Sequence, residues 1–261
     1  MVTVAVLPHC AGISEGKMNK NGIYLCLTAA LFLTAVCTAC EPLYTIEELQ
    51  YDDERNFTTQ TVSGGGAVRI TGYTGTKKAL IIPRQIQNLP VTEIGGGAFS
   101  QKELTDVVIP DTVTSIGDSA FYENKLMSLT IPGSVTDIGG WAFYNNDLVY
   151  NLTIPGSVTS IGWSAFSNNI LKSVNISGAA AIGSSAFSSN LLTSITISGS
   201  GASVDGFAFG INRITRITIA ANVSILSYNY DAFDDNFADF YNANGCKAGT
   251  YILRNGNWVE E

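Results

Sequence analysis

The residues that most enzymes use for nucleophilic or acid–base chemistry are scarce in this sequence. Its single histidine is His9, so the rest of the chain lacks the imidazole that a Ser-His-Asp triad, a Cys-His pair or a histidine-ligated zinc site requires. Cys246 is the only cysteine after Cys40, and Lys247 is the only basic residue beside it that could activate the thiol. We therefore expect no enzymatic activity and no cofactor.

Four aspartates near the C-terminal end could instead supply oxygen ligands to calcium. They are Asp231, Asp234, Asp235 and Asp239. The sequence around them does not form a calcium loop of about twelve residues, so we interpret them as a charged end that keeps the fold soluble. The glycine clusters at 64–66 and 95–97 lack the Lys-Ser/Thr pair and the helix of a phosphate-binding loop, and they predict turns.

The composition predicts a folded protein whose partner is not a nucleic acid. Hydrophobic residues make up 46% of the chain and charged residues 14%, which provides enough apolar surface for a sizeable core. The formal net charge is −8, and the 14 basic residues are scattered. Because phosphate binding needs clustered lysines and arginines, this balance excludes nucleic-acid binding as the expected function.

The start of the chain has the zones of a bacterial export signal. Lys20 is followed by an apolar run at 23–36 that is too short for a comfortable membrane span, and then by small residues. Such signals begin close to their initiator, so Met18 is the better start, and we interpret residues 1–17 as a misassigned start. We expect a signal peptide over 18–39 and an exported protein.

The residues before Cys40 resemble a bacterial lipoprotein signal. Thr38 and Ala39 are small and precede a cysteine of the kind that carries the lipid and becomes the new N-terminus. This resemblance implies lipidation of Cys40 and contact with a membrane through that anchor alone. An ordinary secretory signal cut near the same place is the alternative. Residues 40–56, rich in Glu and Asp, are interpreted as a tether.

The dominant pattern in the remaining sequence is a repeat with a step of 21 to 24 residues. In most copies an aliphatic residue followed by Gly stands five residues before a phenylalanine, and Asn stands three residues after it. The phenylalanine follows Ala in every copy, at Phe99, Phe121, Phe143, Phe166, Phe187, Phe209 and Phe233. This period predicts a leucine-rich-repeat solenoid, in which each coil buries its apolar side only by stacking on its neighbours.

Most copies also contain a short alternation of aliphatic and small polar residues, as in Leu129-Thr-Ile131 and Leu152-Thr-Ile154. A period of two predicts a strand with aliphatic side chains inward, so the stacked coils, about seven, should form a parallel sheet. The Gly after the next isoleucine predicts a tight bend. We expect the repeated phenylalanines to fill the core and the repeated asparagines to satisfy backbone groups rather than to form a functional row.

Both ends of the solenoid carry hairpin patterns. Residues 57–62 and 68–73 flank a run of Ser and Gly, and residues 250–253 and 257–259 flank the turn Asn255-Gly256. We expect these hairpins to cover the open ends of the stack. The expected segments are 57–240 for the solenoid with its N-terminal cap and 241–261 for the C-terminal cap hairpin.

Two sequence units carry a resemblance to a known family. Val113-Thr-Ser-Ile-Gly-Asp-Ser-Ala-Phe121 and Leu129-Thr-Ile-Pro-Gly-Ser-Val-Thr-Asp-Ile-Gly139 resemble the Treponema pallidum type of leucine-rich repeat, also called BspA-like. The likeness runs from about Val68 to Phe233, and residues 241–258 resemble a terminal cap of spirochaete members. This sequence differs from that family in having Asn at a repeat position where the family often has Cys. The resemblance implies a cell-surface or secreted protein that takes part in adhesion.

Two surfaces are candidates for binding another macromolecule. Aromatic residues stand where other copies have Asp, Ser or Gly, and such residues are common binding anchors; they are Tyr122, Trp141, Tyr144, Tyr150 and Trp163. The outward strand positions form a row of mostly small polar side chains: Ser128, Thr130, Asn151, Thr153, Ser173, Asn175, Ser194, Thr196, Arg216 and Thr218. Packing of aromatics between coils and an ordinary solvated sheet are the alternatives.

These patterns together predict a lipid-anchored binding protein in the periplasm or on the outer surface. We expect a monomer whose ligand is a protein, such as a host matrix protein or a host or bacterial surface protein, with adhesion as the outcome. A periplasmic or envelope scaffold without host contact is the alternative. A glycoside hydrolase that works with two carboxyl groups is the remaining enzymatic alternative.

Overall fold

The computed structural model describes residues 50–178, 180–226, 232–233 and 236–261. Gln50–Glu261 form one compact unit, and the separate unit Met1–Leu49 lies outside the described residues. The expected misassigned start, the signal peptide and Cys40 therefore fall outside the described part of the chain, as do Asp231, Asp234 and Asp235. Within the described ranges, no helix has the length and apolar character needed to cross a membrane.

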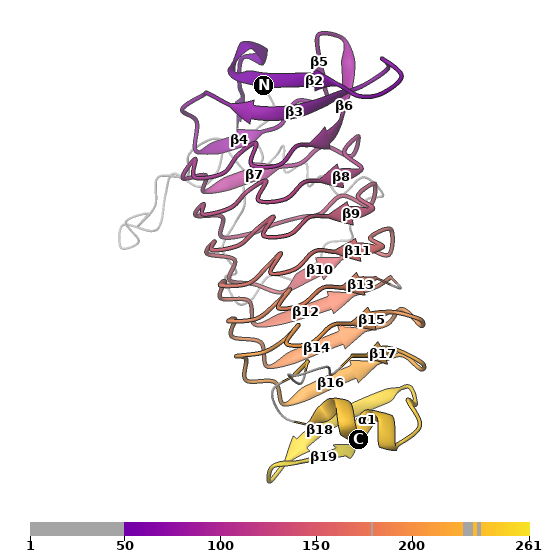
Figure 1. Cartoon of the computed structure of the whole chain (residues 1–261). Helices are drawn as coiled ribbons and strands as arrows, with labels where there is room; N and C mark the ends of the chain where they lie inside the picture. Colours follow the sequence, from indigo (N-terminus) through magenta and orange to yellow (C-terminus); the bar gives the residue numbers. More distant parts are fainter. Residues whose placement is uncertain (1–49, 179, 227–231, 234–235) are drawn as a thin grey trace, which may run out of the picture. The chain divides into compact units, whose positions relative to one another are not determined.

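The folded unit is a solenoid of stacked coils with strands along two faces (Figure 1). The predicted aliphatic alternation lies on one of them, which we call the strand face. A three-stranded parallel sheet there has the order β1 (Gln50–Tyr51), β4 (Ala79–Ile81), β7 (Asp106–Val108). A six-stranded sheet follows in the order β10 (Leu152–Ile154), β12 (Ser173–Ile176), β14 (Ser194–Ile197), β16 (Arg216–Ile219), β18 (Gly249–Arg254), β19 (Asn257–Glu260). The leucine-rich-repeat fold is confirmed.

A second sheet runs along the other face, which we call the short-strand face. Its order is β17 (Ser224–Ile225), β15 (Ser203–Val204), β13 (Ala181–Ile182), β11 (Ser160–Ile161), β9 (Asp137–Ile138), β8 (Ser115–Ile116), β6 (Leu89–Ile94), β3 (Val68–Tyr73), β2 (Phe57–Thr61), with β5 (Gln85–Ile86) paired to β6. The sequence predicts only a bend near these isoleucines. This interpretation is incomplete, because the isoleucine first pairs with its equivalents in neighbouring coils and the chain bends afterwards.

The repeated phenylalanines form a continuous stack through the core. Their rings are nearly parallel, with centroids 5.1–5.3 Å apart from Phe99 to Phe233. The stack ends against Phe57 and Tyr73 on one side and against Phe237 on the other. Buried aliphatic side chains from both faces pack around it, so the predicted core role of the phenylalanines is confirmed.

The repeated asparagines bind backbone groups of neighbouring coils, as predicted. Asn169 is buried; its Oδ1 accepts a hydrogen bond from the Leu148 amide at 3.2 Å, and its Nδ2 donates to the Phe143 carbonyl at 3.0 Å. The same pattern is made by Asn124, Asn146, Asn190 and Asn212. Asn236 departs from the row, because it is exposed and precedes a helix.

Hairpins close both ends of the stack, as the sequence predicts. β2 and β3 pair antiparallel at the N-terminal end, and β18 and β19 do so at the C-terminal end, where β18 also pairs antiparallel with β16. The helix α1 (Phe237–Ala243), which the repeat pattern does not predict, buries Phe237, Ala238 and Tyr241 against this cap. The segment expected to be a tether ends earlier than predicted, since β1 and the 3-10 turn Glu54–Asn56 belong to the folded unit.

Candidate binding surfaces

The strand face carries a row of small polar side chains in register. The row consists of Thr153, Asn175, Thr196, Thr218 and Thr250. The aliphatic residues between them are buried, as at Leu152 and Ile154, so the predicted alternation of inward and outward side chains is confirmed on these strands. Hydroxyl and amide groups at a constant spacing can donate and accept hydrogen bonds along this face.

The other strand-face residues selected from the sequence also lie on or near this surface. The exposed ones are Ser128, Thr130, Asn151, Thr153, Asn175 and Arg216, and the partly buried ones are Ser173, Ser194, Thr196 and Thr218. At the C-terminal end Arg216 pairs with Glu261, and the Thr218 and Thr250 hydroxyls lie 3.0 Å apart. The row is therefore most accessible to a ligand before β16.

The strand face is interrupted between β7 and β10. Leu129–Ile131, which the sequence predicts as a strand, forms none, and within the described ranges no backbone hydrogen bond joins residues 128–131 to a neighbouring coil. The step from Phe143 to Phe166 is 23 residues, one more than the step before it. The extra residue lies next to Tyr150, just before β10, and we attribute the missing pairing with β10 to it.

Three large apolar side chains are exposed in the interrupted coil and on the two coils beside it. The exposed fractions are 39% for Val108, 51% for Met127 and 67% for Tyr150. The Val149 amide donates to the Met127 carbonyl at 3.2 Å, so Tyr150 and Met127 are on adjacent backbone. We call Val108, Met127 and Tyr150 the strand-face patch. Of these three residues only Tyr150 is predicted from the sequence as a binding residue, although Val108 and Met127 stand where other copies have Thr.

The five predicted aromatic residues do not form one cluster. Tyr122 and Tyr144 stack with centroids 5.3 Å apart at an interplanar angle of 9°, and Trp141 and Trp163 meet edge to face. Tyr150 makes no ring contact with the other described aromatic side chains and belongs to the strand face. The sequence could not separate these groups, because Tyr150 stands only nine residues after Trp141 but beyond the asparagine turn.

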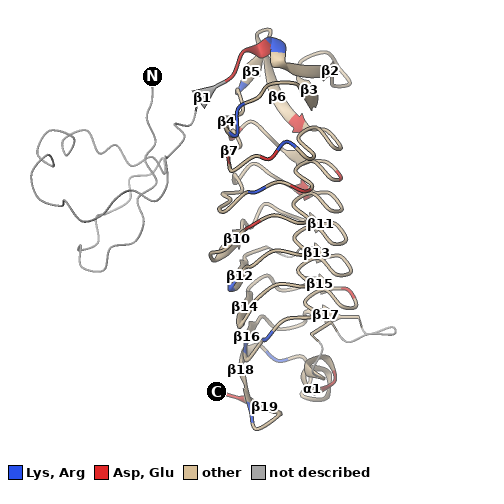
Figure 2. Cartoon of the chain, turned by 90° about the vertical axis from the view of Figure 1, so that its left-hand side faces the viewer, with Lys and Arg blue, Asp and Glu red and all other residues tan. Residues whose placement is uncertain are grey.

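Charged side chains are sparse in the middle of the solenoid (Figure 2). Between Ile138 and Val204 the only charged residues are Asp147 and Lys172. The ion pairs lie nearer the ends, such as Arg69 with Glu93 and Arg84 with Asp111; exposed pairs of this kind contribute little stability. The central coils therefore present a surface on which little charge must be desolvated when a ligand binds.

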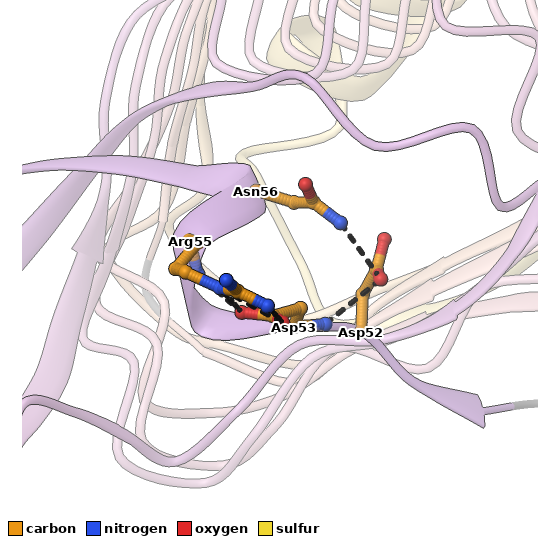
Figure 3. A network of polar contacts seen from close by, with 4 residues as sticks. All are labelled: Asp52, Asp53, Arg55 and Asn56. Atoms are coloured by element: carbon orange, nitrogen blue, oxygen red, sulfur yellow. Dashed lines mark hydrogen bonds and ion pairs between the residues drawn. The ribbon is translucent and has the colours of Figure 1, made fainter.

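A polar network links Asp52, Asp53, Arg55 and Asn56 in the segment before β2 (Figure 3), and Tyr73 joins it to the N-terminal hairpin. Asp52 accepts hydrogen bonds from the Tyr73 hydroxyl at 2.5 Å, from Asn56 Nδ2 at 2.9 Å and from the Asp53 amide at 2.8 Å. Burial raises the pKa of the Asp52 carboxyl, but these hydrogen bonds outweigh it and hold the pKa below its ordinary value. The hydrogen bonds from Arg55 lower the pKa of Asp53 to about 2. This network fixes the first residues of the folded unit.

Groups able to hold a metal do not gather in the described part of the chain. Within it, no three His, Cys, Asp or Glu side chains are placed to share an ion. Asp239, the described member of the aspartate set, is exposed on α1, and Cys246 is half-buried with Sγ 3.6 Å from Asn242 Oδ1. The chemistry that these surfaces offer is recognition through hydrogen bonds and apolar contact.

Comparison with protein-family models gives a match over most of the solenoid. The model of the BspA type leucine rich repeat region matches residues 79–190 and 125–239, with six copies. Together these ranges span more than half of the chain. A search of curated proteins found no match.

The chain is also similar to solved bacterial structures. It is 25% identical to a leucine rich repeat protein of T. pallidum, with a TM-score of 0.56, over 67% of this chain and 86% of that one. It is 21% identical to a leucine-rich repeat protein from Bacteroides ovatus, with a TM-score of 0.44, over 65% of this chain and 56% of that one. For a leucine rich cell surface protein from Faecalibacterium prausnitzii the values are 23%, 0.41, 78% and 59%. The first of these similarities supports the repeat fold.

Proposed function

The chain belongs to the BspA-type leucine-rich repeat family, and from this premise we propose that it is a lipid-anchored extracytoplasmic protein that binds another protein through its strand face. Repeats of this family mediate protein–protein interaction in general. In this proposal the ligand is a host matrix protein or a host or bacterial surface protein, the outcome is adhesion, and the solenoid acts as a monomer.

The observation that carries the proposal is the strand-face patch. Tyr150 is the most exposed large apolar residue among those described, and protein interfaces are enriched in Tyr and Met and depleted of charge at their centres. Thr153 follows Tyr150 in the same coil, and Ser128 and Thr130 follow Met127 in the coil before; all three are exposed, so they supply a polar rim. An aromatic anchor inside a hydrogen-bonding rim is the arrangement that concentrates binding energy.

Binding to an immobilised panel of extracellular-matrix proteins and to intact bacterial and epithelial cells tests the proposal. We expect Tyr150→Ala to weaken any contact that the full chain makes by about tenfold or more, because a buried aromatic anchor carries much of the binding energy. Met127→Ala should weaken it less. Ser224→Ala, an exposed change on the short-strand face, is the control. A contact that survives Tyr150→Ala unchanged would contradict the role of the strand face.

The anchor and the location of the protein are tested separately. The support for them is the charged, apolar and small-residue pattern of residues 18–40. If Cys40 carries a lipid, Cys40→Ala should move the protein from the membrane to the soluble fraction. Protease treatment of intact cells then distinguishes the two candidate functions: digestion of the solenoid supports a surface adhesin, whereas protection supports an envelope scaffold without host contact.

A further inference from the structure

The turns that follow the short-strand face carry two pairs of aromatic side chains. Trp141 meets Trp163 of the next coil edge to face, and Tyr122 stacks on Tyr144. The Tyr144 amide donates to the Trp141 carbonyl at 3.1 Å, so one turn supplies a member of each pair. Trp163 is 48% exposed. These two pairs therefore place aromatic surface along one edge of the solenoid, away from the strand face.

Planar hydrogen-bonding groups follow the aromatic residues in the same turns. Asn168 Nδ2 donates to Asn145 Oδ1 at 2.6 Å, and Gln101 Nε2 donates to Glu123 at 2.7 Å. These four side chains occupy equivalent positions in consecutive coils, and all but the partly exposed Glu123 are exposed. We call the set formed by Tyr122, Trp141, Tyr144, Trp163, Gln101, Glu123, Asn145 and Asn168 the turn edge.

The fold does not require tryptophan at either position. Ser119, Ser164 and Ser185 occupy the position of Trp141 in other coils, and Gly96, Gly140 and Ser184 occupy that of Trp163. Trp141 also has a left-handed backbone with φ +53°, a conformation that is uncommon for a bulky residue. At Gly140 a Cβ atom would lie 2.6 Å from the Trp163 indole nitrogen, so the missing side chain makes room for that ring. Trp141 thus has a strained backbone, and Trp163 fills the space that Gly140 leaves open. Packing requires neither of these two side chains.

The spacing and charge of the turn edge fit one class of ligand. Equivalent rings in successive coils lie 5.1–5.3 Å apart between centroids, both in the phenylalanine stack and at the Tyr122–Tyr144 pair of the turn edge, which is close to the length of one sugar unit in an extended β-linked chain. Aromatic rings stack on the C–H face of a sugar, and amides hydrogen-bond its hydroxyl groups. The carboxylates of Asp118 and Glu123 lie in these same turns and disfavour an anionic chain.

We propose that the turn edge binds a neutral β-linked glycan that lies along the stack of coils with about one sugar unit per coil. The exposed face of Trp163 provides the stacking platform, with Trp141 packed edge to face against it, and Asn145 and Asn168 bind the hydroxyl groups. This activity is additional to protein binding at the strand face and uses different residues. It would allow one molecule to hold a polysaccharide and a protein ligand at the same time.

Titration of the full chain with soluble oligosaccharides tests this proposal by calorimetry and by tryptophan fluorescence. Only Trp258 lies outside the turn edge among the three tryptophans, so the fluorescence reports mainly on the proposed site. The probes are hexamers of β-1,4-linked glucose, N-acetylglucosamine and mannose, with cellobiose and the α-linked maltohexaose for comparison. We expect saturable binding of at least one β-linked hexamer and weaker binding of the dimer and of the α-linked chain.

Matched variants locate the site. Trp163→Ser introduces the residue that the next coil already has at this position, Ser184, so the fold should be retained, and we expect a loss of affinity of about tenfold. Tyr150→Ala on the strand face should leave glycan binding unchanged. If none of the three β-linked hexamers binds, if maltohexaose binds equally well, or if Trp163→Ser binds as tightly as the natural chain, the proposal is wrong. None of these outcomes concerns Tyr150. The proposed protein binding at the strand face is therefore tested separately, by Tyr150→Ala.

Discussion

Asn146 and Phe121 lie in neighbouring coils and are joined by a hydrogen bond, in which Asn146 Nδ2 donates to the Phe121 carbonyl at 3.0 Å. The Oδ1 atom of the same side chain accepts from the Leu126 amide at 3.1 Å. A side chain from one coil thus satisfies both a donor and an acceptor of the coil before it. This contact links the asparagine row to the phenylalanine stack, because each asparagine of the row binds the backbone carbonyl of the phenylalanine in the coil before its own.

Replacement of Asn146 should destabilise the solenoid although the side chain is small. Asn146→Leu keeps the volume but leaves the Leu126 amide and the Phe121 carbonyl without this partner in a buried place. We expect a loss of about 2–3 kcal/mol in the free energy of unfolding, measured by urea denaturation. Asn151→Ala, at an exposed asparagine, should change it by no more than about 0.5 kcal/mol. Equal stability of the two variants would contradict the bridging role.

Truncation of a central ring tests the phenylalanine stack. Phe143 is fully buried between Phe121 and Phe166, at centroid distances of 5.1 and 5.2 Å. Phe143→Ala should cost about 3–5 kcal/mol, since it opens a cavity and removes two ring contacts. Tyr144→Ala, next to it on the surface, should cost less than half as much. Thermal melting of both variants provides the comparison, and a Phe143→Ala variant as stable as Tyr144→Ala would rule out a core role for the ring.

The period of the sequence was sufficient to predict the solenoid and its core, because a buried phenylalanine recurs in every coil and a buried asparagine in most of them, and the hairpin patterns at the two ends predicted the caps. The second sheet was missed because its strands in the repeated coils, from β8 to β17, are two residues long, as at Ile138 and Ile161. Two residues are too few for an alternation to be visible. The helix α1 follows the last copy, so the period gives no information about it.

The candidate sites were predicted less well than the fold, because they depend on departures from the repeat. The strand face is interrupted at Leu129–Ile131, although the residues there match the strand pattern. The turn edge depends on which side of the asparagine turn an aromatic residue occupies. Tyr144 and Tyr150 are close in sequence but belong to different surfaces, because the chain turns at the repeated asparagine between them.

The close approach of successive turns predicts a large effect of a small change at Gly162. A Cβ atom there would lie 2.3 Å from the Gly140 amide nitrogen and 2.5 Å from the Gly139 carbonyl carbon. The backbone of two coils must separate to accommodate it, so Gly162→Ala should cost about 3 kcal/mol. A Cβ atom at Gly133 would meet no atom within 4 Å, so Gly133→Ala is the matched control and should be neutral or slightly stabilising. Chemical denaturation of both variants checks this; a tolerated Gly162→Ala would contradict the coil spacing.

Backbone strain at Ile211 predicts a stabilising substitution. Its φ is +53°, a region that β-branched residues rarely adopt and that Asn tolerates. Asn145 and Asn168 hold the equivalent position in other coils with similar φ values of 53° and 58°. Ile211→Asn should therefore raise the free energy of unfolding by about 0.5–1 kcal/mol. Ile170→Asn is the control, because it also replaces an exposed isoleucine but without a left-handed backbone. If both variants shift the melting temperature equally, strain is not the cause.

The Asp52–Tyr73 hydrogen bond predicts how the N-terminal end of the folded unit responds to acid. The folded-state pKa of Asp52 lies below its ordinary value, so its ionised form is favoured by folding. The stabilisation is present above the unfolded pKa and is lost as the pH falls through the folded one. In urea denaturation from about pH 7 to about pH 2, the natural chain should therefore exceed Asp52→Asn in stability at neutral pH and approach it in acid. Tyr73→Phe removes the hydroxyl donor and should reduce this pH dependence, whereas Asp239→Asn on α1 should leave it unchanged. A constant difference between the natural chain and Asp52→Asn across this range would show that the carboxylate charge does not hold this end in place.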